Sequence, residues 1–174
     1  RFSNGKVWIE HVSEAYGLNT TFGNGNSPGD NRAFGGSQTG QGYSYLTLPN
    51  SGAQINNYLA NVQSSFTNTD VIFLWAGGND FLYGTGNPDL ISQNMASHIL
   101  TLAQAGGSRF VVANLPPLEL TPEGASRTAQ QQATMASDVV SYNNKLAQEM
   151  SNLSSSMSID ITLIDAWTVF NDIV

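Results

Sequence analysis

The most informative segment of this sequence is Val71-Ile72-Phe73-Leu74-Trp75-Ala76-Gly77-Gly78-Asn79-Asp80. Its first five residues are large and apolar, which is typical of a strand buried on both faces of a parallel sheet. Gly77 and Gly78 then allow a sharp turn of the backbone. Asn79 and Asp80 follow at the carboxyl end of the strand, where ligands bind in open α/β sheets. An amide held there can donate a hydrogen bond to a developing oxyanion, although a simple polar turn explains the same two residues.

The segments around this strand alternate between strand-like and helix-like patterns. Apolar runs predict further strands at 109–115 and 159–166. Helical spacing of apolar residues predicts helices over 7–16, 49–66, 88–105 and 129–153, the third with Asn87 as its N-cap. The last helix is expected to turn Ala136, Val139, Val140, Leu146 and Met150 inward. This alternation predicts a single α/β domain over 1–174, a three-layer sandwich with a parallel sheet.

The composition restricts the class of protein. A chain of 174 residues suits one domain, and its net charge of −7 argues against binding to nucleic acid or to an anionic membrane surface. It contains no cysteine, so it has neither a disulfide framework nor a thiolate site. Only 11% of residues are charged, and the polar residues are mostly uncharged, as in many secreted proteins. No membrane-length apolar run is visible, and we expect a secreted monomer. The sequons at Asn19 and Asn152 matter only in a secreted protein, and two can arise by chance in this composition.

A second informative segment is Asn31-Arg32-Ala33-Phe34-Gly35-Gly36-Ser37-Gln38-Thr39-Gly40. A short extended piece ends here in a double glycine, and glycines after a strand can expose backbone N–H groups to a ligand. A Gly-x-Ser-x-Gly nucleophile elbow would require glycine in place of Thr39. Two alternatives stay open, a glycine-rich surface loop and an unrelated small hydrolase in which Ser37 is the nucleophile.

The sequence contains no complete hydrolytic centre. A catalytic serine needs a histidine within reach and a carboxylate to orient that histidine. The two histidines, His11 and His98, both fall in predicted helices, where we expect a half-buried structural role for His11 and a structural role for His98. No cluster has metal-ligand spacing, and we expect neither a metal nor a cofactor. Asp165 and Asp172 follow a strand, and isolated carboxylates of this kind usually cap helices or form turns.

Five short motifs give the chain a resemblance to the GDSL esterases/lipases of the SGNH hydrolase superfamily, in the secreted fungal and bacterial branch. They occur in the family's order over essentially all 174 residues: Arg1-Phe2-Ser3-Asn4-Gly5-x-Val7-Trp8, Asn31-x-Ala33-x-Gly35-Gly36, Trp75-Ala76-Gly77-Gly78-Asn79-Asp80, Asn114-Leu115-Pro116-Pro117, and Leu163-Ile164-Asp165-Ala166 leading to Phe170-Asn171-Asp172-Ile173. Any one of these motifs is weak, but five in register are strong.

The resemblance implies roles for three residues. Gly36 matches the glycine whose backbone N–H contributes to the family's oxyanion hole, and Asn79 matches the asparagine whose side-chain amide completes it. Asp80 resembles the neighbour that supports this turn. The family's Gly-Asp-Ser-Leu block, with the nucleophile, belongs before Arg1, and its Asp-x-x-His block, with the base, belongs after Val174. The resemblance therefore implies an internal fragment of a serine esterase, acting on carboxylic esters that include acetyl esters of carbohydrates.

The same resemblance implies an incomplete sheet. A flavodoxin-like strand order places the first strand between the second and the third, and this chain lacks that first strand. We therefore expect the 174 residues either to fold poorly or to rearrange so that neighbouring strands close the gap. The alternative function is a non-catalytic carbohydrate-binding or degenerate module. In it Tyr83, Trp8 and Trp75 would offer apolar surface to a sugar, although the two tryptophans are expected in the core.

Overall fold

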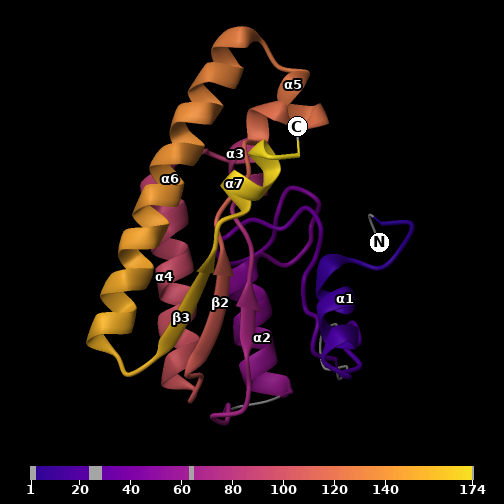
Figure 1. Cartoon of the computed structure of the whole chain (residues 1–174), viewed down its shortest axis with the longest axis vertical. Helices are drawn as coiled ribbons and strands as arrows, with labels where there is room; N and C mark the ends of the chain where they lie inside the picture. Colours follow the sequence, from indigo (N-terminus) through magenta and orange to yellow (C-terminus); the bar gives the residue numbers. More distant parts are fainter. Residues whose placement is uncertain (1–2, 24–28, 63–64, 174) are drawn as a thin grey trace.

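The chain folds around one parallel sheet with helices packed against it (Figure 1). The structure is a computed structural model and describes residues 3–23, 29–62 and 65–173. Its strands are β1 (Ile72–Leu74), β2 (Arg109–Ala113) and β3 (Asp160–Ile164), in the order β1-β2-β3 with both pairs parallel. The predicted α/β class with a parallel sheet is confirmed.

The helices follow the predicted alternation closely. They are α1 (Trp8–Ala15), α2 (Ser51–Asn61), α3 (Gly78–Tyr83), α4 (Pro88–Gln104), α5 (Pro122–Ala125), α6 (Ala129–Ser156) and α7 (Ala166–Asn171), with a 3-10 turn η1 (Leu118–Leu120). The four predicted helices correspond to α1, α2, α4 and α6. Helix α2 ends at Asn61 rather than near 66, and residues 63–64 lie outside the described residues, as do Arg1 and Phe2 of the first motif. Asn79 and Asp80 belong to α3, where the sequence predicted only a turn.

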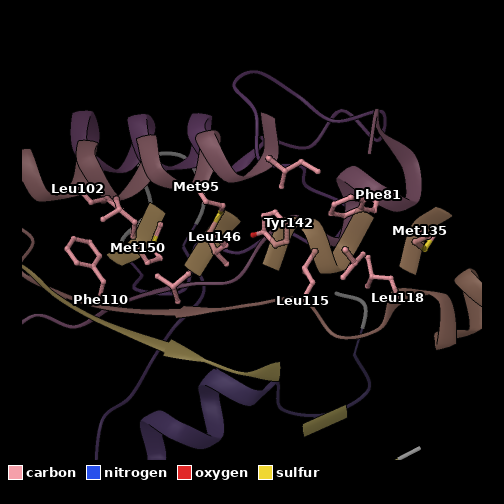
Figure 2. Packing of buried hydrophobic residues seen from close by; sticks show 14 residues of the cluster. Phe81, Met95, Leu102, Phe110, Leu115, Leu118, Met135, Tyr142, Leu146 and Met150 are labelled. Carbon is pink, nitrogen blue, oxygen red and sulfur yellow. The ribbon is translucent and has the colours of Figure 1, made fainter. Parts of the chain in front are cut away.

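The hydrophobic core lies between one face of the sheet and the helices α4 and α6 (Figure 2). Its fully buried members include Phe110 and Val112 of β2, Met95 of α4, and Tyr142 and Leu146 of α6. Helix α4 contributes the predicted apolar face, with Ile91, Met95, Ile99 and Leu102 all buried. Figure 1 shows α4 and α6 together on one side of the strands, with α1 on the opposite side of the molecule.

The inward face of α6 differs from the prediction at Val140, Met135 and Tyr142, and Ala136 is only half-buried. Val140 is 42% exposed, whereas Met135 and Tyr142, which were not predicted, are buried. The buried positions 135, 139, 142, 146 and 150 advance by three or four residues, so they form one stripe along the helix. Val140 lies next to Val139 in sequence and therefore about 100° around the helix from that stripe.

The prediction that the 71–75 strand is buried on both faces is wrong. Ile72 and Leu74 pack against the core, but Phe73 is 37% exposed and Trp75 is 41% exposed. Alternate residues of a strand point to opposite faces, and only one face of this sheet is covered by α4 and α6. On the other face, Trp8 of α1 makes edge-to-face contacts with Phe73 and Trp75, at centroid distances of 5.7 and 6.0 Å. Trp8 is itself 40% exposed, so neither tryptophan is a core residue.

The segment expected to form a strand before Gly35 does not join the sheet. Asn31 makes a single isolated bridge to Phe22, and 32–34 has no strand assignment. Within the described residues β1 pairs only with β2, so neighbouring strands have not rearranged to close the expected gap. How stably the chain folds by itself stays a prediction. Within the same residues, none of the helices combines the length and the apolar character of a membrane span.

Candidate active site

The turn after β1 places the start of α3 against the glycine-rich loop that contains Gly36, Ser37 and Thr39. Gly77 is the N-cap of α3 and has a left-handed φ of 112°. A Cβ at this position would lie 3.2 Å from Ile91 Cγ2 and 3.4 Å from Tyr142 Cζ, so glycine suits both the conformation and the space. The Tyr142 hydroxyl donates a hydrogen bond of 3.3 Å to the carbonyl of Ala76, just before the turn. Tyr142 thus supports the turn from the core, a contact that the sequence did not reveal.

Asn79 occupies the first turn of α3 and faces the glycine-rich loop. Its side-chain nitrogen donates to the backbone carbonyl of Ser37 at 2.9 Å, which fixes the orientation of the amide. A side-chain amide has two N–H groups. Among the described residues, the Ser37 carbonyl is the only acceptor of a hydrogen bond from the Asn79 amide. Asn79 is only half-buried and lines a cleft of about 270 Å³. The remaining N–H is therefore available to a ligand in that cleft.

Gly36 lies one residue before Ser37 and has a left-handed φ of 88°. A Cβ at Gly36 would lie 2.7 Å from Leu46 Cδ1, so a larger residue would require the side chain of Leu46 to move. No described residue accepts a hydrogen bond from the Gly36 N–H. The structure thus brings the Gly36 loop and Asn79 together through Ser37, although Gly36 itself is not among the residues that line the cleft. The oxyanion roles of Gly36 and Asn79 stay predictions.

Asp80 bonds to the same loop and is buried, with 9% of its surface exposed. Its carboxylate accepts hydrogen bonds from Thr39 N at 3.2 and 3.0 Å and from Thr39 Oγ1 at 2.7 Å. Burial raises the pKa of Asp80, while the hydrogen bonds from Thr39 oppose that rise because they stabilise the charged form. This geometry suits the supporting role that the resemblance implied for Asp80.

Two further side chains of α4 reach the loop, and the sequence analysis gave neither of them a part in the site. Asn94 donates to Thr39 Oγ1 at 3.1 Å, and His98 Nε2 donates to the carbonyl of Thr39 at 2.7 Å. His98 is buried with 4% exposure, and this burial lowers its pKa, against the opposing effect of the bond to Thr39. The structural role expected for His98 agrees with these contacts. Asn94 and His98 are four residues apart, and this polar pair on one helix face is the signal that could have revealed them.

Ser37 is engaged in structural contacts. It is 8% exposed, and its hydroxyl donates to the carbonyl of Pro49 at 2.7 Å and accepts from Gln54 Nε2 at 3.0 Å. In the described residues, no histidine contacts this hydroxyl. These contacts give no support to Ser37 as a nucleophile, which requires an adjacent base. The expectation that His11 is half-buried is wrong, because the turns of α1 leave it exposed.

Trp75 after β1 and Leu115 and Pro116 after β2 also line the cleft, and Asn114 joins these strand ends to the end of β3. The carbonyl of Asn114 accepts a hydrogen bond of 3.0 Å from Trp75 Nε1, and its side chain donates to Asp165 Oδ1 at 2.9 Å. Asp165 is the N-cap of α7 and accepts from Thr168 N and Oγ1, which confirms the expected capping role. The Thr168 hydroxyl, followed by the Asn114 amide, lowers the pKa of Asp165. Asp172 lies exposed at the end of α7.

The cleft therefore combines a few fixed polar groups with apolar walls. Its lining consists of Ala33, Phe34, Ser37, Ser51, Gln54, Trp75, Ala76, Gly77, Gly78, Asn79, Leu115, Pro116 and Leu118. Such a lining suits an apolar or weakly polar group whose carbonyl oxygen meets the Asn79 amide. Among the residues that the structure describes, no group of three or more His, Cys, Asp or Glu side chains could hold a metal ion.

Comparison with known proteins relates the chain to a protein family. The family model described as GDSL-like lipase/acylhydrolase matches residues 1–173. The chain is 29% identical over 174 residues to the thermolabile hemolysin of Vibrio parahaemolyticus serotype O3:K6 (strain RIMD 2210633), covering 97% of this chain and 38% of that protein. It is 28% identical over 151 residues to the phosphatidylcholine-sterol acyltransferase of Aeromonas hydrophila, covering 84% of this chain and 43% of that protein. The chain thus spans less than half the length of either curated relative.

Proposed function

Because the chain belongs to the GDSL-like lipase/acylhydrolase family, we propose that it supplies the oxyanion-binding half of a carboxylic ester hydrolase. The observation that carries the proposal is the amide of Asn79, which is held by the Ser37 carbonyl and has its second N–H free beside the cleft. The backbone N–H of Gly36, on the same loop as Ser37, is the proposed second donor. Asp80 supports both donors through its bonds to Thr39.

The proposed reaction proceeds through an acyl-serine. A serine oxygen attacks the ester carbonyl carbon, and the electron pair of the carbonyl moves onto its oxygen, where Asn79 and Gly36 stabilise the negative charge. Collapse of this intermediate expels the alcohol, which takes up the proton that a general base removed from the serine. Water then releases the acid by the same steps. We propose that the nucleophile and the base come from residues outside these 174, consistent with the partial coverage of both relatives.

Replacement of Asn79 tests this function directly. The gene product that includes the coding sequence flanking these residues should hydrolyse p-nitrophenyl esters. Asn79→Ala should then lower kcat about 10²–10³-fold, the usual effect of removing one oxyanion donor. Asn61→Ala, at the exposed end of α2, is the matched control and should leave kcat unchanged. Equal turnover in Asn79→Ala and the wild type would refute the assignment.

We further propose that the substrates include acetyl esters of carbohydrates. The small volume of the cleft supports a short acyl group, and the exposed pair Tyr45–Tyr83, with a centroid distance of 5.1 Å, supports contact with a sugar. The names of the two relatives refer instead to haemolysis and to acyl transfer from phosphatidylcholine to a sterol. Initial rates on acetylated xylan and on phosphatidylcholine vesicles, compared at equal enzyme concentration, distinguish these substrates.

The exposed aromatic side chains also support a second candidate function, a carbohydrate-binding or degenerate module without chemistry. Tyr83 is 44% exposed, and Trp75, which lines the cleft, is 41% exposed. A protein of this kind would bind an oligosaccharide, with binding lost in Tyr83→Ala, yet release no acid from any ester.

We also propose that the protein is secreted and that it is a monomer. Its uncharged polar composition supports the secretion. Its recovery from the culture medium and its mass by light scattering test that proposal.

A further inference from the structure

A buried polar network lies behind Asn79, and the proposed chemistry makes no direct use of it. Thr39 is completely buried, and all three of its polar groups have partners. Its N–H and hydroxyl donate to Asp80, its hydroxyl accepts from Asn94, and its carbonyl accepts from His98. Each polar group of Thr39 thus has a partner, and hydrogen bonds run from the Asn94 amide to the Thr39 hydroxyl and from that hydroxyl to the Asp80 carboxylate. Because Thr39 is buried with all its polar groups bonded, its side chain is held in one orientation.

This network and the Asn79 bond join the same two pieces of chain. Asn79 and Asp80 are consecutive on α3, and they bind Ser37 and Thr39, which lie two residues apart on the loop. The two contacts act as a double clamp, because neither piece can rotate or slide relative to the other without breaking one of them. The loop has no sheet ladder to hold it, since 32–41 has no strand assignment. Backbone hydrogen bonds from Ser51 N to the Gln38 carbonyl and from Gly52 N to the Gly40 carbonyl tie the loop to the start of α2. Its contacts with α3 and α4 are made by the side chains of Asn79, Asp80, Asn94 and His98.

We infer that Thr39, held by Asn94 and His98 of α4, is the positioning residue that sets the distance and angle between the Gly36 N–H and the Asn79 amide. This inference rests on the oxyanion role proposed above for those two donors. Oxyanion donors act only when both lie about 2.7–3.1 Å from one point, so an arrangement fixed before the substrate arrives is part of catalysis. The side chain of Thr39 touches neither substrate nor reacting atoms, and its effect is transmitted through Asp80 and the loop.

The matched variants are Thr39→Val and Thr39→Ser in the full gene product. Valine keeps the shape but loses the hydroxyl that donates to Asp80 and accepts from Asn94, whereas serine keeps that hydroxyl. Thr39→Val should lower kcat about 10-fold or more with KM nearly unchanged, and Thr39→Ser should restore kcat to within about 3-fold of the wild type. If Thr39 affected only stability, Thr39→Val would lower the folded fraction but leave the turnover of each folded molecule unchanged. The kcat values are therefore expressed per folded molecule.

Hydrogen exchange provides a readout that is independent of activity. The Asn79 side-chain proton bound to the Ser37 carbonyl should exchange about 10-fold faster in Thr39→Val than in Thr39→Ser, measured by NMR. If Thr39→Val does not fold, Asn94→Ala replaces it, because Asn94 is only partly buried and donates to the same hydroxyl.

The outcomes separate the two proposals. If Asn79→Ala abolishes turnover while Thr39→Val and Thr39→Ser have equal kcat values and equal exchange rates, the positioning role of Thr39 is overturned and the function stands. If Asn79→Ala has no effect on turnover, the proposed function fails, and the exchange rates alone decide whether Thr39 positions Asn79. Faster exchange and lower kcat in Thr39→Val alone support the inference.

Discussion

At the scale of single residues, the site depends on the Asp80 carboxylate, whose surroundings have opposing effects on its pKa. Burial of Asp80 disfavours its charged form, and the hydrogen bonds from the Thr39 N–H and hydroxyl favour that form. Burial has the larger effect, so the pKa of Asp80 is raised. Since Thr39 offers two donors to this group, the carboxylate is well placed to accept them once it is charged.

The raised pKa predicts how stability depends on pH. A carboxyl whose pKa is higher in the folded than in the unfolded state binds more protons when folded, so its contribution to stability is greatest in acid. That contribution should be lost as the pH rises from about 4 through the raised pKa of Asp80. The unfolding free energy of the wild type relative to Asp80→Asn, measured in urea titrations, should therefore fall as the pH rises above about 4.

Asp172→Asn is the matched control for this experiment. It also removes one negative charge, but from an exposed position at the end of α7. If the unfolding free energy of the wild type relative to Asp80→Asn instead rises with pH, the burial argument is contradicted. Such a rise would mean that the folded state favours the charged form of Asp80.

At the scale of elements, the helices that build the site begin at capping residues that are visible in the sequence. Asn87 accepts hydrogen bonds from Asp89 N at 3.0 Å and from Leu90 N at 3.1 Å, and Pro88 occupies the first position of α4. The predicted N-cap is thereby confirmed. Helix α4 carries both Asn94 and His98, so this cap fixes the start of the element that holds Thr39.

Removal of this cap should destabilise the protein by a modest amount. Asn87→Ala leaves two N–H groups without their side-chain acceptor and should lower the unfolding free energy by about 1 kcal/mol. Asn87→Ser keeps a capping oxygen and should lie within a few tenths of a kcal/mol of the wild type. Denaturant titrations of the three proteins make this comparison. Equal losses in the alanine and serine variants would show that the cap has no part in the stability of α4.

At the scale of the whole molecule, the sheet is covered unequally. Helices α4 and α6 bury one face, while on the other face Phe73, Trp75 and Ile164 are each more than one-third exposed. The free edge of β1 adds backbone groups with no ladder partner among the described residues. Unpaired strand edges and exposed apolar surface both favour loose folding or association.

The 174 residues expressed alone should therefore unfold in a broad transition and bind the dye ANS, which reports exposed apolar surface. Expression together with the flanking coding sequence should sharpen the melt and reduce dye binding. Circular dichroism against temperature gives the first measurement, and dye fluorescence gives the second. A sharp, cooperative melt of the isolated chain with no dye binding would show that the open face is tolerated.

The fold class, the parallel sheet, the four longer helices and the Asn87 cap could be predicted from the sequence because each depends on local pattern. Apolar spacing, glycine pairs and capping residues act over a few neighbours along the chain. The motif around Asn79 and Asp80 was visible for the same reason. The proximity of the Gly36 loop to Asn79 was implied by family resemblance alone.

Only the tertiary structure decided which side chains join distant segments. Thr39 and Asp80 are 41 residues apart, Thr39 and His98 are 59 apart, and Tyr142 and Ala76 are 66 apart. No local pattern encodes such pairs, because they form only when helices pack on the sheet. The same holds for burial. The apolar run at 71–75 was expected to be covered on both faces, but whether a strand's second face is covered depends on which elements the rest of the chain places against it.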